Sequence, residues 1–205
     1  MAIPISELQS LTPTAKIELF ILELVEGTHY ATGNPSNVPT TFRFHSGTNM
    51  NTNNNIIWQG DTYEKFAIAA EGFAFEGRGQ IPRPTLTMSN VGGITRSGQL
   101  INVSDLMTIV NITTPANDLI NTKLTRLQVL ASSLDAANFT GNTNPFGTPN
   151  SNELPREVFF IDRKTAETRS TVQFELVSRL DQQNKKLPKR QVTRDEFPSV
   201  GGFIN

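Results

Sequence analysis

Apolar side chains recur at every second position in several short segments of this chain. The clearest examples are Ile17, Leu19 and Ile21; Phe42 and Phe44; Leu86 and Met88; and Val172, Phe174 and Leu176. Successive side chains of a β-strand point to opposite faces, so this spacing places apolar residues on one face of a strand. A chain built mainly from such segments is predicted to fold as a sheet with a buried face.

The composition agrees with a strand-rich fold that carries long polar loops. The chain has 19 Asn and 24 Thr among 205 residues, while charged residues make up 18% and the net charge is −1. Threonine is favoured in strands, and asparagine tolerates the left-handed conformations of turns. The near-neutral charge gives no bulk electrostatic basis for binding nucleic acid or an acidic membrane.

Several segments are predicted to form particular strands. Ala15–Val25 is apolar on both faces, which predicts a strand covered on both sides, and Ile56–Trp58 with Thr62–Ile68 predicts a hairpin. Phe73 and Phe75 are predicted to share one face of a short strand that ends at Gly77-Arg78-Gly79.

Two later segments complete the expected sheet. Pro82 and Pro84 lack backbone donors, so the strand Thr85–Val91 is expected to begin at a sheet edge or a bulge. Arg156–Asp162 and Ser170–Leu180 predict a last hairpin.

One region breaks the strand pattern. Ser104 is a candidate N-cap for a helix that includes Leu106 and Val110, and Thr114-Pro115 predicts the start of a second short helix. The expected class is therefore all-β: an antiparallel barrel or sandwich over residues 1–180, with a helical insertion near 101–121. Residues 181–205 are predicted to form an extended C-terminal arm, charged at first and Gly-rich later.

No residue pattern predicts a catalytic, cofactor or metal site. The chain has no Cys, and His29 and His45 lack the spacing of a metal-binding pair. Glu64, Glu71 and Glu76 would allow a paired-carboxylate hydrolase only if two of them faced a common cleft. The basic run from 185 to 190, followed by Arg194, favours a solvated arm over a nucleic-acid site, because no aromatic residue is interleaved with it.

The block from Trp58 to Asn90 carries the strongest functional signal. It contains Trp58-Gln59-Gly60 with Tyr63, then Gly72-Phe73, Gly77-Arg78-Gly79 and the run from Arg83 to Asn90. Together with Leu134-Asp135-Ala136-Ala137-Asn138-Phe139 and the weaker Leu187-Pro188-Lys189-Arg190, it resembles the minor tail protein L family of lambda-type bacteriophages.

The resemblance implies a non-enzymatic tail-tip component, made in the host cytoplasm and located in the virion. It would form part of a hub that joins the distal tail ring to the central fibre or receptor-binding protein, as a homo-oligomeric, trimeric ring. Two alternatives stay open from the residues: a carbohydrate- or receptor-binding module that uses Trp58 and Tyr63, and a peptidoglycan hydrolase that uses two of the glutamates.

The chain departs from the lambda-type pattern in its last part. Lambda-type members continue into a Cys-rich region that holds an iron–sulfur cluster, whereas this sequence has no Cys and stops at Asn205, so we expect it to bind no such cluster. Phe197 stands near the position of the first cluster ligand and is predicted to be an apolar plug there. With Val200, Phe203 and Ile204 it forms the candidate partner interface of the arm.

Overall fold

The computed structural model describes residues 3–33, 40–47, 55–74, 81–91, 93–96 and 98–181. The strands are β1 (Lys16–Glu23), β2 (Thr41–His45), β3 (Ile56–Trp58), β4 (Asp61–Lys65), β5 (Ile68–Glu71), β6 (Thr85–Ser89), β7 (Ile94–Arg96), β8 (Gln99–Ile101), β9 (Lys123–Leu130), β10 (Glu157–Glu167) and β11 (Thr171–Val177). The helices are α1 (Ile5–Leu8) and α2 (Val103–Thr113), with short 3₁₀ turns η1 (Ala131–Ser133), η2 (Ala136–Asn138) and η3 (Thr140–Asn142).

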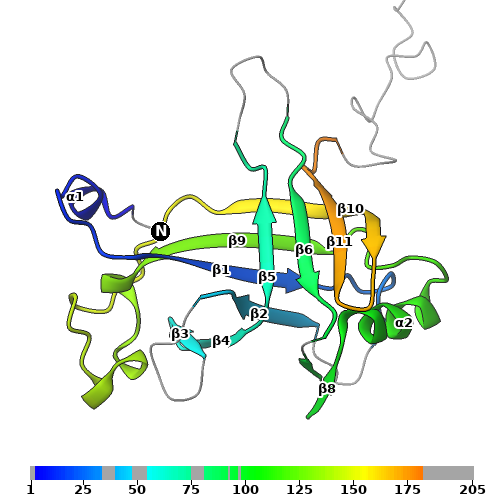
Figure 1. Ribbon diagram of the computed structural model, residues 1–205, viewed down its shortest axis with the longest axis horizontal. Helices are drawn as coiled ribbons and strands as arrows, with labels where there is room; N and C mark the ends of the chain where they lie inside the picture. The colour runs from blue at the N-terminus through cyan, green and yellow to red at the C-terminus, as the bar shows by residue number, and fades with distance from the viewer. Residues whose placement is uncertain are drawn as a thin grey trace, which may run out of the picture.

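Nine of these strands form one sheet in the order β3-β4-β2-β1-β9-β10-β11-β6-β5. The pairs are antiparallel except β2 with β4, which is parallel. In Figure 1, β5, β6 and β11 cross steeply over β1 and β9, so the sheet is strongly folded. β10 pairs with β9 on one side and with β11 on the other. Its pairing with β11 contains two register shifts, between Ile161 and Arg163 and between Lys164 and Ala166, and such irregularities bend a strand.

The segment from β4 to β5 brings the sheet back onto itself. β4 pairs with β2, and β5 pairs with β6, which lies in the other half of the sheet. At the corner, the Phe66 amide donates to the His45 carbonyl (2.9 Å) and the Ser89 amide donates to the Ala67 carbonyl (2.8 Å). The predicted all-β class with a small helical insertion is confirmed, and this returning segment gives the sheet a barrel-like form.

Two apolar clusters lie on the two faces of β1. Phe20 and Leu22 belong to the main core inside the folded sheet, which α2 also enters through Leu106 and Val110. Leu19 belongs to a second cluster on the outer face, beneath the β3–β4 hairpin. The prediction that this strand is covered on both sides is confirmed, because its side chains alternate between the two clusters.

The burial predicted from the alternating pattern is confirmed over most of the described residues. Leu19, Leu86, Met88, Val172 and Phe174 are buried, and Ile17 and Phe73 are half-buried. Phe75 and the Gly77-Arg78-Gly79 element lie outside the described residues.

The strand predicted through Phe73 is wrong. β5 ends at Glu71, and Gly72 turns the backbone out of the strand with a φ of +88°. The prediction that the strand after the two prolines begins at a sheet edge or a bulge is also wrong, because β6 lies between β5 and β11 and both of its registers are continuous. Pro82 and Pro84 are tolerated because they precede β6, and Pro84 only accepts a hydrogen bond there, from the Leu176 amide (2.8 Å).

The predicted N-cap of the helix is wrong by two residues. Asn102 caps α2 by accepting from the Asp105 amide (2.7 Å), and Asp105 accepts in return from the Asn102 amide (3.3 Å), which forms a capping box. The Ser104 hydroxyl instead accepts from Asn90 (2.9 Å) and donates to Glu167 (2.5 Å). The contact with Asn90 therefore occupies the Ser104 side chain, and the capping box fixes the helix start at Asn102.

The predicted second helix does not form. The segment after Thr114 contains residues with left-handed backbone conformations at Ala116, Asp118, Leu119 and Asn121. The Asn111 side chain holds Asp118 there: it accepts from the Asp118 amide (2.9 Å) and donates to the Asp118 carboxylate (2.8 Å). Repeated positive φ values are incompatible with a right-handed helix, so this segment is a compact turn that leads into β9.

The glycine that ends β5 gives a direct test of this part of the fold. Gly72→Ala should lower the free energy of unfolding by about 1–2 kcal/mol, because an L-residue is strained at this positive φ. A Cβ atom there would also lie 3.4 Å from the Pro84 Cα. Gly47→Ala is the control, since Gly47 is not left-handed and its added Cβ would have no contact closer than 3.8 Å. Urea unfolding of both variants measures the difference, and equal stabilities would contradict the expectation.

Candidate functional site

The first part of the motif block forms a tight hairpin. β3 and β4 are joined by Gln59 and Gly60, whose φ values are +53° and +78°. Two successive positive φ values in a two-residue connection are those of a type I′ turn, which matches the twist of the flanking strands. The hairpin predicted at this position is confirmed.

Trp58 and Tyr63 are core residues of this hairpin. Only 3% of Trp58 and 1% of Tyr63 are exposed, and both pack against Leu127, Val129 and Leu134 in the outer cluster. Burial raises the pKa of the Tyr63 hydroxyl to about 12. A sugar-binding platform needs exposed aromatic faces, so the carbohydrate-binding alternative loses the two residues on which it was based.

The second motif, 75 to 81 residues further along the chain, holds the first in place. The Asp135 carboxylate accepts from the amides of Gln59 (3.1 Å) and Gly60 (2.8 Å). The Asn138 side chain accepts from the Ile57 amide (2.7 Å) and donates to the Ile57 carbonyl (2.5 Å). We call Asp135 and Asn138 the hairpin clamp.

The hairpin clamp also finishes an edge of the sheet. β3 is a terminal strand, and the Ile57 amide and carbonyl face away from β4. Asn138 satisfies both groups with one side-chain amide, as a neighbouring strand would, and it is fully buried. Exposed strand edges attract further strands, so this contact closes an otherwise available pairing site.

The middle of the block packs against the border of the main core, where Phe73 is half-buried. The Phe73 ring lies 4.4 Å from the Arg126 guanidinium carbon and edge-on to Phe159 at 5.4 Å. Arg126 also forms ion pairs with Glu18 and Glu157, the latter at 2.6 Å. These contacts fasten the chain after β5 to β1, β9 and β10, so Phe73 has a structural role.

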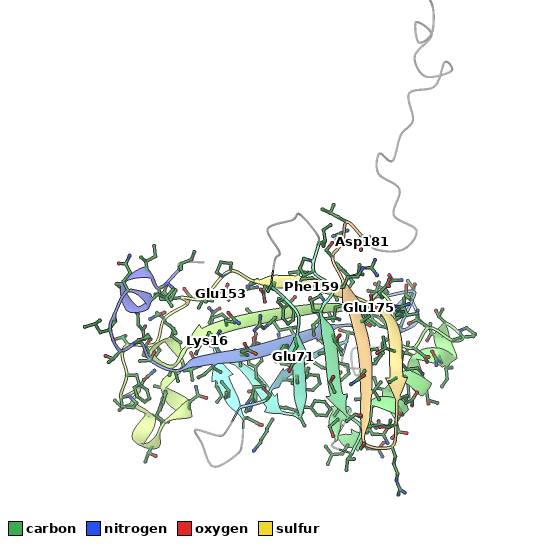
Figure 2. The ribbon with its side chains drawn as sticks, turned by 45° about the horizontal axis from the view of Figure 1, so that its top comes forward. Lys16, Glu71, Glu153, Phe159, Glu175 and Asp181 are labelled. Atoms are coloured by element: carbon green, nitrogen blue, oxygen red, sulfur yellow. The ribbon has the colours of Figure 1, made fainter. Side chains whose placement is uncertain are left out.

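The end of the block is bonded to the last residues that the structure describes. Arg83 donates to Asp181 (3.0 Å from Nε) and to Glu175 (3.0 Å from Nη1). Hydrogen bonds from Arg163 and Arg83 hold the pKa of Glu175 below its usual value. Figure 2 shows Glu175 and Asp181 on the same side of the molecule, at the end of β11. Asp181, the last described residue, is thus held beside β11.

The residues considered for an enzyme do not form a site in the part of the chain that the structure describes. Glu64 is half-buried on β4, Glu71 is exposed at the end of β5, and Glu76 lies outside the described residues. Among the described residues, no group of three or more His, Cys, Asp or Glu side chains could hold a metal ion. Within the same residues, no helix is long and apolar enough to cross a membrane.

His29 is buried and joins two loops. Its Nδ1 accepts from the Val25 amide (2.8 Å), and its Nε2 lies 2.8 Å from the Ile120 carbonyl, which assigns the proton to Nε2. The ring therefore connects the end of β1 to the left-handed turn before β9. Burial lowers the pKa of His29 below its usual value of 6.5.

The burial of His29 predicts a pH dependence of stability. Because its pKa is lower in the folded state than in the unfolded state, only the unfolded state gains the proton as the pH falls below about 6.5. The free energy of unfolding should therefore decrease from pH 6.5 downward and level off below the folded pKa. Urea unfolding between pH 7 and 5 measures the slope, and His29→Gln should reduce it. An unchanged slope in the variant would contradict this assignment.

The largest exposed apolar feature within one short stretch is at the N-terminal end. Ile3, Ile5, Leu8 and Leu11 are exposed, Ile5 to 59% and Leu11 completely, and we call them the N-terminal apolar patch. The short helix α1 lies within this stretch, and none of its residues is buried.

The chain thus combines an all-β body, motifs that serve the fold, and an exposed apolar surface, which is typical of a structural assembly module. The family model for phage minor tail protein L matches residues 36–199, and the chain belongs to this family. It is similar to tail tip protein L of Escherichia phage lambda, with 32% identity over 101 residues. The match covers 49% of this chain and 37% of that relative, so it spans well under half of the relative's length.

Proposed function

We propose that this protein is a subunit of the phage tail-tip hub that works without catalysis. Family membership makes it a structural component of a bacteriophage tail. The finer role assigned here is to join the distal tail ring to the central fibre or receptor-binding protein, as a ring of identical subunits and most simply a trimer. It would be synthesised in the host cytoplasm and function in the virion.

The observation that carries the proposal is the N-terminal apolar patch on a module of this family. Single exposed apolar side chains are ordinary, but four of them within nine residues favour a surface that another protein covers. A cyclic ring uses two different surfaces of each subunit, so each copy must present such a surface to a neighbour. The motif residues support the same role, because the hairpin clamp and Phe73 make contacts that hold the fold together.

A phage that carries a stop codon early in this reading frame tests the proposal. We expect it to yield no infectious particles unless the protein is supplied from a plasmid, and electron microscopy should show incomplete tail tips. In complemented particles, mass spectrometry should detect the protein in a ratio of three, or a multiple of three, copies per tail. Normal infectious particles without the protein would refute the proposal, and another fixed ratio would refute the trimer alone.

A further inference from the structure

The short helix α1 is oriented opposite to a typical amphipathic helix. Its acidic residue, Glu7, points toward the protein and accepts from the Thr14 amide (3.3 Å), the Thr14 hydroxyl and the Ser132 hydroxyl. Its apolar residues, Ile5 and Leu8, are three positions apart and exposed. A surface helix usually buries its apolar side chains and exposes its charged ones.

The anchor of Glu7 shows that this orientation is fixed. Partial burial raises the pKa of the carboxyl, but the hydrogen bonds from Ser132 and Thr14 outweigh it and hold the pKa below its usual value. Ser132 belongs to η1, which directly follows β9, so α1 is attached to a central strand of the sheet. The N-terminal apolar patch is therefore presented outward on a firm base.

The segment that carries the patch also contributes no uncompensated charge. Glu7 is the only ionisable side chain between Ile3 and Pro13, and its carboxylate is used by the internal hydrogen bonds. A ligand for this surface should be apolar and uncharged, because burying a charge against it would leave that charge unpaired.

The C-terminal arm contains a segment with these properties. The nine residues from Phe197 to Asn205 include Phe197, Val200, Phe203 and Ile204 and no charged side chain. They are preceded by residues 182–196, which carry Lys185, Lys186, Lys189, Arg190, Arg194, Asp195 and Glu196. The sequence thus places an apolar tip after a polar tether, and fifteen extended residues can span roughly 50 Å.

We propose that the tip, Phe197–Ile204, of one copy docks on the N-terminal apolar patch of a neighbouring copy. This inference rests on the proposed function, in which copies of the chain lie side by side. The tether begins at Asp181, which Arg83 holds beside β11. Figure 1 shows α1 at one end of the long axis and β11 toward the other, so the tether would have to run back along its own sheet to reach its own patch. A neighbouring copy offers the same patch without that constraint.

Cysteine cross-linking of full-length chains tests the contact, because the native sequence contains no Cys that could interfere. One chain carries Leu11→Cys, which changes a fully exposed residue, and a second chain of different tag length carries Phe203→Cys. The control pairs Phe203→Cys with Ile112→Cys, an 80% exposed apolar position on α2. Mixtures are oxidised mildly, and the mixed disulfide dimer is followed on non-reducing gels.

We expect the Leu11→Cys mixture to form the mixed dimer at least ten times faster than the Ile112→Cys mixture. Adding Ile5→Asp and Leu8→Asp to the Leu11→Cys chain should reduce its rate to that of the control, while circular dichroism shows an unchanged fold. Equal rates in the first two mixtures would overturn the proposal. A chain that carries both Leu11→Cys and Phe203→Cys and forms mainly an internal disulfide would also overturn it, since the tip would then occupy its own patch.

The result is separable from the proposed function. Cross-linking tests the docking contact on purified chains, whereas the hub role is tested by the infectivity and composition of phage particles. A negative cross-link with a positive particle test would remove the docking contact and leave the hub role in place. A positive cross-link, together with normal particles that lack the protein, would remove the hub role and leave the docking contact in place.

Discussion

Asn138→Ala should be the most destabilising single polar substitution that we predict for this protein, costing about 3 kcal/mol in the free energy of unfolding. The side chain is fully buried and makes three hydrogen bonds, two with Ile57 and one to the Asp135 carbonyl (2.8 Å). Each bond contributes about 1 kcal/mol, and the Ile57 groups would be left buried without partners. For a chain of this length, the melting temperature should fall by roughly 6–12 °C.

Two further variants separate the hydrogen bonds from the volume of the side chain. Asn138→Asp keeps the size and the acceptor for the Ile57 amide, but it replaces the donor to the Ile57 carbonyl with a second oxygen, so it should be at least as destabilising as alanine. Asn150→Ala removes an exposed side chain whose hydrogen bonds stay within its own loop, and it should change the free energy by less than about 0.5 kcal/mol. An effect of Asn138→Ala no larger than that of Asn150→Ala would show that the hairpin clamp is not needed for stability.

Deletion of residues 197–205 should have the largest functional effect, an almost complete loss of infectious particles with little change in the fold of the subunit. Among the described residues, the main and outer clusters are already continuous without any contribution from 197–205, so the truncated chain is expected to stay folded and soluble. The tip would no longer supply its four apolar side chains to a partner. Plaque titre is measured by complementing a phage that lacks the gene, and circular dichroism is measured on the purified chain.

A full-length control shows whether the apolar side chains or the length of the arm matter. Replacing Phe197, Val200, Phe203 and Ile204 by serine keeps the chain length and should reduce the titre as much as the deletion does. Ser199→Ala, in the same segment, should leave the titre unchanged. A normal titre from either the deletion or the serine variant would refute a role for the tip in assembly.

The motifs that resemble the minor tail protein L family have structural roles in this fold. Trp58 and Tyr63 are buried, Gly60 and Gly72 adopt positive φ, and Asp135 and Asn138 bind the backbone of the β3–β4 hairpin. The sequence alone suggested exposed binding roles for the two aromatics as one alternative. No local signal marked Asp135 or Asn138 as partners of that hairpin, because the contact spans 75 or more residues of sequence.

The amino-acid sequence by itself determined much of the local structure. The period of two predicted β1, β2, β6 and the β10–β11 hairpin, and Ser104 predicted the helix start to within two residues. These features depend on side-chain alternation, turn geometry and capping, which act between residues close in the chain.

Only the tertiary structure decided how these elements meet. The corner at Phe66 and Ala67 joins the two halves of the sheet through backbone bonds to β2 and β6, which no local pattern encodes. The choice of Asn102 over Ser104 as the N-cap depended on a contact with Asn90, and the outward face of α1 depended on Glu7 reaching Ser132. Each of these outcomes was set by a hydrogen bond between distant segments, where several local conformations were equally compatible with the sequence.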